Sequence, residues 1–170
     1  MLFRYKYLRL SVLVLMLMVG THVVTAIQHK EFVEVANAQT EEEQKQEADR
    51  LIDAGKEQYE SSEFAEALQS YEQALKIYRM INDKSQEGNT LNHLGLVYAD
   101  LGEYSRAQEF YEQSLSIFQQ LDDRLGIGNS FKGLGLVYRN LGEYAVAQQY
   151  YEQALVIFRE IGKKKLKVLL

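Results

Sequence analysis

The sequence predicts an all-α protein made of three stacked, antiparallel helix-turn-helix repeats. The segment from Leu94 to Phe118 recurs forty residues later, from Leu134 to Phe158, with 17 of 25 positions identical. A more divergent copy around residues 55–78 keeps Gly55 and Tyr71 in the same register. Repetition at a fixed period of this size is typical of arrays in which each unit buries its apolar face against its neighbours.

The first 38 residues differ from the rest and predict a signal peptide or an N-terminal membrane anchor. Basic residues up to Arg9 precede an apolar run from Leu10 to Val19, which is the order found in secretory signals. Cleavage could follow Ala26 or Ala38. An uncleaved anchor would be just long enough to span a bilayer. Both alternatives predict a protein that is exported, to the periplasm or beyond the cell, or membrane-anchored by its N-terminus.

The chain after residue 38 is acidic. Four of the 19 basic and two of the 24 acidic residues lie before that point, which leaves a net charge of −7. This balance argues against a nucleic-acid partner, and it restricts membrane contact to the N-terminal segment if that segment is uncleaved. The basic and apolar residues 164–170 are interpreted as a short solvated tail.

The repeats are expected over residues 49–163, after a charged linker or helix start at 39–48. Thr40 there begins a capping-box pattern. The periodic residues divide the array in the register 51–90, 91–130 and 131–170.

The second copy shows why each repeat should hold two helices. Leu91, Leu94 and Tyr98 follow one another at helical spacing, and Gly102 ends the pattern. A second apolar stripe runs from Tyr104 to Phe118.

The third copy repeats this pattern, with Phe131 in the place of Leu91. Asp122 and Asp123, between the copies, are suited to cap the next helix. Gly95 and Gly135 in mid-helix predict that another helix crosses too closely for a side chain.

These positions resemble the tetratricopeptide repeat. Its pattern of apolar residue, Leu-Gly, tyrosine, turn glycine, alanine and aromatic is matched at Leu91, Leu94, Gly95, Tyr98, Gly102, Ala107 and Tyr111, and again forty residues later. The period of 40 rather than 34 residues is similar to the long-helix subclass of kinesin light chains and bacterial tandem arrays. Tryptophan and proline are absent, and the first copy has Gln58 for the tyrosine and Ser62 for the turn glycine. The resemblance implies a right-handed α-solenoid.

The resemblance also implies a concave groove, lined by the first helix of each repeat, that holds a peptide or helix of a partner protein. Carried over by register, the groove residues are Lys56, Tyr59, Asn89, Asn92, Asp100, Asn129, Lys132, Arg139 and Asn140. An asparagine amide can both donate to and accept from a peptide backbone. Asn89 and Asn129 could instead serve only at helix ends. The clamp by which some relatives hold a chaperone tail is absent, because its positions are Ile52, Lys56, His93, Asn129 and Gly133.

The residues do not suggest an enzyme. Cysteine is absent, and His93 is the one histidine after residue 38, whereas a catalytic site needs several convergent groups. We therefore expect no catalytic residue, no metal site and no cofactor.

The expected function is that of a protein-interaction scaffold or adaptor. Two alternatives stay open: the chain could be the N-terminal repeat portion of a longer exported array or effector protein, or it could self-associate through an uncapped C-terminal face.

Overall fold

A computed structural model describes residues 40–168, with side chains up to Gly162. The signal-peptide prediction lies outside these residues. The described chain consists of a helix at 40–60 followed by α2 (Phe64–Met80), α3 (Lys84–Asp100), α4 (Tyr104–Gln120), α5 (Arg124–Asn140) and α6 (Tyr144–Val168). Within residues 40–168 no helix is both long and apolar enough to cross a membrane.

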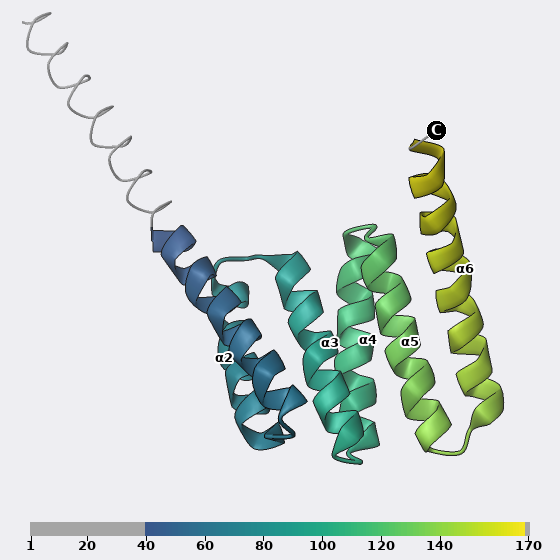
Figure 1. The fold of residues 1–170 in the computed structure, drawn as a ribbon, viewed down its shortest axis with the longest axis horizontal. Coiled ribbons are helices and arrows are strands. Elements are labelled where there is room, and N and C mark those ends of the chain that lie inside the picture. The colour runs from purple at the N-terminus through teal and green to yellow at the C-terminus, as the bar shows by residue number, and fades with distance from the viewer. Residues whose placement is uncertain (1–39, 169–170) are drawn as a thin grey trace, which may run out of the picture. The chain divides into compact units, whose positions relative to one another are not determined.

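The helices form a row in which each packs antiparallel to the next (Figure 1). Helix 40–60 pairs with α2, α3 with α4, and α5 with α6, and α3 also packs against α5. The predicted all-α solenoid of three helix pairs is confirmed. Helices α3 and α5 begin at Lys84 and Arg124. The predicted repeat boundaries, 51–90, 91–130 and 131–170, therefore fall inside the first helix of each repeat and not at its start.

Every connection between helices within residues 40–168 is three residues long, and all five adopt the same turn. The central residue has a positive φ in each: Ser62, Asn82, Gly102, Asp122 and Gly142. In each turn this residue donates to the carbonyl three residues earlier, and the next residue donates to the carbonyl five residues earlier. This pair of bonds is the Schellman motif, which satisfies the last carbonyls of a helix. One turn geometry therefore serves both within and between repeats.

Aspartates cap the first helices of the second and third repeats. The Asp83 carboxylate accepts from the amide of Gln86, and Asp123 accepts from those of Leu125 and Gly126. Of the two residues predicted as caps, Asp123 has this role, whereas Asp122 occupies the left-handed position of the turn, with a φ of 53°.

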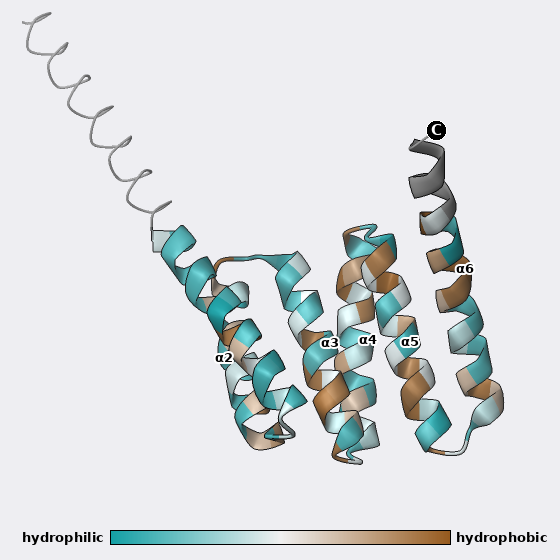
Figure 2. Ribbon diagram, in the orientation of Figure 1, coloured by the Kyte–Doolittle hydropathy of each residue, from teal (hydrophilic) through white to brown (hydrophobic). Residues whose placement is uncertain are grey.

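The core consists of the apolar stripes predicted from the repeat. The rings of Tyr71, Tyr78 and Phe118 are at most 1% exposed, and hydrophobic residues alternate with hydrophilic ones along each helix (Figure 2). Tyr144, in contrast, is 71% exposed.

The mid-helix glycines make room for aromatic rings. A Cβ on Gly95 would lie 3.0 Å from Cε1 of Tyr111, and one on Gly135 would lie 2.7 Å from Cε1 of Tyr151. Another helix therefore comes too close for a side chain at these two positions, as predicted, and the part of it that does so is an aromatic ring. Gly133 of α5 also lies against the ring of Tyr111. The ring of Phe118 likewise contacts one glycine of α3, Gly88, and one of α5, Gly126.

Candidate partner-binding groove

The first helices of the repeats present one recurring face, and two hollows lie along it. Four positions on each helix, at spacings of three and four residues, contribute to this face, as expected for one side of a helix. They are Asp49, Ile52, Asp53 and Lys56 on helix 40–60, Asn89, Asn92, His93 and Leu96 on α3, and Asn129, Lys132, Gly133 and Leu136 on α5.

The first hollow lies between helix 40–60 and α3 and has a volume of about 400 Å³. Its lining is polar and comes from both helices and α2, namely Asp49, Ile52, Asp53, Lys56, Tyr78, Gln86, Asn89, Thr90 and His93. Lys56 pairs with Asp53 at 2.9 Å.

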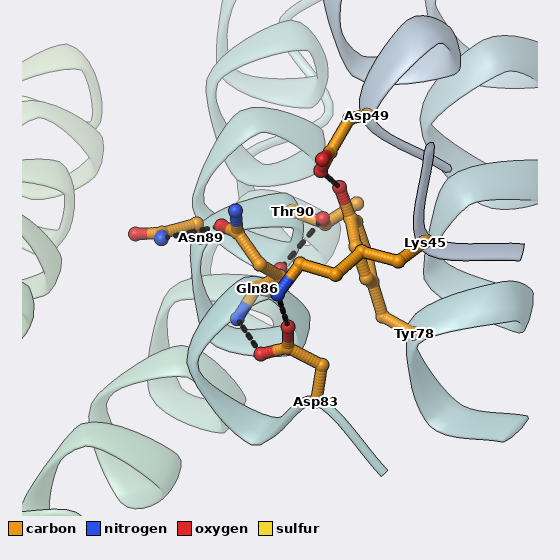
Figure 3. A network of polar contacts seen from close by, with 7 residues as sticks. All are labelled: Lys45, Asp49, Tyr78, Asp83, Gln86, Asn89 and Thr90. Carbon is orange, nitrogen blue, oxygen red and sulfur yellow. Dashed lines mark hydrogen bonds and ion pairs between the residues drawn. The ribbon is translucent and has the colours of Figure 1, made fainter. Parts of the chain in front are cut away.

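A polar network fixes one wall of the first hollow (Figure 3). The Tyr78 hydroxyl donates to Oδ1 of Asp49 at 2.5 Å, which ties α2 to helix 40–60. Lys45 Nζ lies 2.9 Å from Oδ2 of Asp83 at the start of α3. Burial alone raises the pKa of Asp83, but the bonds from Lys45 and from backbone amides outweigh it and leave that pKa below its ordinary value. Helix 40–60 is therefore anchored through charged and hydroxyl groups as well as apolar contacts.

Asn89 belongs to the same network and joins the two hollows. Its amide nitrogen donates to Oε1 of Gln86 at 3.0 Å (Figure 3), and the residue lines both hollows. Since Asn89 lies inside α3, five residues after Lys84, it does not cap the helix. The alternative that it serves only at a helix end is therefore wrong, and the same holds for Asn129 in α5.

The second hollow lies between α3 and α5 and has a volume of about 330 Å³. Leu96, Leu136 and the ring of Tyr111 give it an apolar part, and amides and Lys132 give it a polar part. Its lining contains no carboxylate. Among the described residues, the side chains of Asn129 and Lys132 form no hydrogen bond or ion pair within the chain. Asn92 uses only its Oδ1, which accepts from the Ser130 hydroxyl at 3.2 Å.

His93 lies between the two hollows. Its ring stacks on Tyr71, with centroids 5.1 Å apart and planes 12° from parallel. Burial, with a further effect of the nearby Lys56, lowers the pKa of His93 below its ordinary value. The imidazole is therefore neutral at pH 7 and adds no charge to either hollow.

The structure brings together five of the nine predicted groove residues: Lys56, Asn89, Asn92, Asn129 and Lys132. The other four lie at the C-terminal ends of the first helices, outside both hollows. Tyr59 and Asp100 bind each other, and the guanidinium of Arg139 donates to Asn140 at 3.4 Å.

Sequence reasoning missed part of the lining. Asp49 and Asp53 stand forty residues before Asn89 and His93, so the register alone could have identified them. Tyr111 reaches the hollow from the second helix of its repeat, which no register signal indicates.

The described residues contain no group of three histidine, aspartate or glutamate side chains placed to hold a metal ion. The arrangement offers instead hydrogen-bonding amides, one free ammonium and an apolar floor. Such a surface can bind the backbone and side chains of an extended polypeptide.

Three solved structures show the same fold. The TPR domain of Arabidopsis FLU is 21% identical, with a TM-score of 0.64, and the match covers 69% of this chain and 98% of that one. Aspartyl phosphate phosphatase F from Bacillus subtilis is 17% identical, with a TM-score of 0.67 and coverages of 70% and 31%. The TPR2AB domain of yeast Sti1, in a complex with pHSP90, is 23% identical, with a TM-score of 0.57 and coverages of 72% and 48%. The chain thus spans less than half of the last two proteins' length.

Two family models match the sequence. One, described as "Tetratricopeptide repeat", matches residues 86–160. The other, described as "Uncharacterized protein conserved in bacteria (DUF2225)", matches residues 2–122. A search of curated proteins finds no match. The chain belongs to the tetratricopeptide repeat family, and through the second match also to the family described as DUF2225.

Proposed function

We propose that this protein is a non-enzymatic interaction scaffold whose groove holds an extended segment of a partner protein. The observation that carries the proposal is the second hollow. Three asparagine side chains, Asn89, Asn92 and Asn129, and the free ammonium of Lys132 surround an apolar floor there. The yeast Sti1 domain, which has the same fold, is known in a complex with pHSP90, and that supports a peptide or protein as the partner.

The unpaired groups favour binding over a structural role. Lys132 is exposed and Asn129 is partly buried, so replacing either side chain should cost the fold little stability. Asn129 and Lys132 are paired with no other described residue, and they remain open to solvent in the absence of a partner. They can therefore form hydrogen bonds with a bound segment without breaking existing ones.

The non-enzymatic part of the proposal rests on the lining of the two hollows. His93 is stacked on Tyr71 and has no hydroxyl or carboxylate bonded to it among the described residues. One structural neighbour is named as a phosphatase, so likeness of fold does not decide this point.

A peptide library displayed on phage would test the groove. Peptides selected on the wild-type protein should bind the double variant Asn129→Ala/Lys132→Ala at least about tenfold more weakly, because lost charged and amide contacts are worth that much. Circular dichroism and melting should be unchanged, since neither side chain has a partner within the described fold.

Arg139→Ala is the matched control. It also removes a cation from the groove side of α5, but from outside both hollows. Equal binding by wild type and this control is expected. If Arg139→Ala weakens binding and the double variant does not, the segment binds at the helix ends and the assignment to the second hollow is wrong.

We also propose export or membrane anchoring through residues 1–38, on the strength of the sequence pattern alone. Cell fractionation combined with N-terminal sequencing of the recovered protein tests this. A new N-terminus after Ala26 or Ala38 would support a cleaved signal, an intact N-terminus in the membrane fraction would support an anchor, and full-length protein in the cytosol would contradict both.

A further inference from the structure

Helix α4 carries a fully buried hydroxyl at a place where the other two repeats have alanine. Ser114 is 0% exposed, and the residues forty positions before and after it, Ala74 and Ala154, are buried as well. An alanine therefore fills this place in the core without any polar group. Burying a hydroxyl costs free energy unless it is hydrogen-bonded, so the reason for this serine lies in the bonds that it makes.

Ser114 belongs to a chain of hydrogen bonds that runs from the core to the second hollow. Its Oγ lies 2.8 Å from the carbonyl oxygen of Gly88 and 3.0 Å from Oγ of Ser130, which is also fully buried. The Ser130 Oγ in turn lies 3.0 Å from the carbonyl oxygen of Gly126 and 3.2 Å from Oδ1 of Asn92. Asn92 is only partly buried and lines the hollow. The chain thus joins side chains of α4, α5 and α3.

Two hydroxyl protons serve these contacts, and Oδ1 of Asn92 is the acceptor that depends on them. The carbonyls of Gly88 and Gly126 lie inside α3 and α5, where each accepts from the amide four residues later. Among the described residues, Oδ1 has no donor other than Ser130. Donation from Ser114 to Ser130, and from Ser130 to Asn92, gives all three side chains a partner and uses each proton once.

These bonds determine which end of the Asn92 amide faces a ligand. Because Oδ1 is held by Ser130, Nδ2 is the end left for the hollow, and an amide nitrogen only donates. Asn89, one turn earlier on α3, is held the opposite way. Its Nδ2 donates to Oε1 of Gln86 at 3.0 Å (Figure 3), which leaves its Oδ1 as an acceptor. This stretch of α3 therefore offers one acceptor and one donor side by side.

We propose that Ser130, held in turn by Ser114, is a positioning residue of the groove: it orients the amide of Asn92 so that Nδ2 donates to a backbone carbonyl of the bound segment. The inference rests on the function proposed above, since it specifies one contact of the same groove. The acceptor at Asn89 fits a backbone N–H of that segment. The two amides together recognise a peptide backbone and not a particular side chain.

Nuclear magnetic resonance of the full chain tests the positioning without any ligand, because nitrogen relaxation of side-chain amides reports their motion on the ps–ns timescale. The Asn92 amide should be rigid in the wild type, and the amide of Asn129, which has no bond within the described fold, is the mobile reference. In Ser130→Ala the Asn92 amide should become as mobile as that of Asn129. Ser130→Thr, which keeps the hydroxyl, should leave it rigid; Thr90, also fully buried, occupies the matching place in α3.

Ser114→Ala is a second variant, and it should fold because Ala74 and Ala154 fill the same place in the other repeats. Without Ser114, Ser130 loses the donor that holds its hydroxyl. The mobility of the Asn92 amide should then lie between those of the wild type and Ser130→Ala. Mobility equal to that of the wild type would exclude Ser114 from the chain. Melting curves check that every variant is folded.

Peptides selected on the wild-type protein by phage display test the contact itself. Ser130→Ala should weaken their binding about fivefold, because the complex must then order a side chain that is already ordered in the wild type. In the Asn92→Ala background the same substitution should change binding less than about twofold, since Ser130 acts through Asn92. The Nδ2 proton signals of Asn92 should move downfield when a peptide is added, as a new hydrogen bond requires.

Two results would overturn the positioning role. One is equal mobility of the Asn92 amide in the wild type and in Ser130→Ala. The other is an equal loss of binding from Ser130→Ala with and without Asn92, which would make Ser130 a purely structural residue. Peptides that bind while the Nδ2 signals stay unchanged would show that Asn92 is not the donor. A library that yields no binding peptide would refute the groove itself, and the mobility comparison in the free protein would still decide the role of Ser130.

Discussion

The hydroxyl of Tyr59 donates a 2.5 Å hydrogen bond to Oδ2 of Asp100, although 41 residues separate them. The bond joins the C-terminal end of helix 40–60 to that of α3. Both residues were predicted to face a partner, and the structure shows that they bind each other. Burial, followed by this bond and the charge of Asp100, raises the pKa of Tyr59 to about 12.

This bond predicts an alkaline limit to stability. The hydroxyl pKa is higher in the folded chain than in the unfolded chain, where it is about 10, so Tyr59 stabilises the fold below pH 10 and this contribution is lost as the pH rises through about 12. Asp100→Asn should lower the pKa of Tyr59 toward its ordinary value. Near-ultraviolet titration, with Tyr59→Phe subtracted to isolate its signal, measures this. An unchanged titration in Asp100→Asn would refute the assigned cause.

The contact between Gly133 and Tyr111 predicts that alanine at position 133 destabilises the fold. Gly133→Ala gains helix propensity but forces a Cβ to within 2.2 Å of the ring. We expect the free energy of unfolding to fall by about 2 kcal/mol, as for other overpacked cores. Urea denaturation measures it.

Gly162→Ala is the corresponding control, because Gly162 is also helical and a Cβ there meets nothing within 4 Å. It should be neutral or stabilising by up to about 1 kcal/mol. Similar losses in both variants would mean that the tyrosine contact is not the cause.

The ion pairs of Glu87 are expected to stabilise the fold at neutral pH and to lose this effect in acid. It is 5% exposed and accepts from Arg79 at 2.8 Å and from Lys84 at 2.7 Å. Burial alone raises its pKa, but these two bonds outweigh burial and leave the pKa below its ordinary value.

Because the folded pKa of Glu87 is below the unfolded one, its ionised form stabilises the fold above about pH 4.3 and loses this effect as the pH falls through the folded pKa. Glu87→Gln should therefore cost about 1–3 kcal/mol at neutral pH, and the difference from wild type should shrink in acid. Thermal melts across this range test it, with Glu57→Gln as an exposed control. A difference that does not depend on pH would contradict the ion-pair explanation.

Because the five turns share one geometry, substitutions at two of them are expected to change stability in opposite directions. Ser62 has a φ of 63°, which is unfavourable for a residue with a Cβ, whereas Gly142 has a φ of 80° without strain. Ser62→Gly should stabilise the protein by roughly 1 kcal/mol, and Gly142→Ser should destabilise it by a similar amount. Chemical denaturation of the two variants measures both signs; a loss of stability in Ser62→Gly would show that its hydroxyl outweighs the backbone strain.

The repeat pattern predicted the helices and the core because both depend on local spacing. Leu91, Leu94 and Tyr98 lie on one face of a helix wherever it packs, and Gly102 is a turn residue in any context. The hollows were predicted in part for the same reason, since Asn92 and Lys132 occupy one register position.

What spacing could not predict was the pairing between side chains of different helices. The bond from Tyr59 to Asp100 depends on how far two helix ends approach, and the contact of Gly133 with Tyr111 depends on the direction of a ring from a neighbouring repeat. The capping role of Asp123 but not Asp122 depended on which of the two took the left-handed turn position. Asp49 and Asp53 were overlooked because the first copy has diverged most from the pattern.

The placement of Tyr111 and Phe118 between glycines of two different helices has a consequence for how the protein unfolds. Each ring is shared by adjoining helix pairs, so loosening one pair exposes aromatic surface belonging to the next. Hydrogen exchange should therefore be slowest around α4, whose rings are enclosed on both sides, and should quicken toward helix 40–60 and α6. Because the helix pairs share these rings, we expect the three repeats to unfold cooperatively, with local unfolding beginning at helix 40–60 and α6.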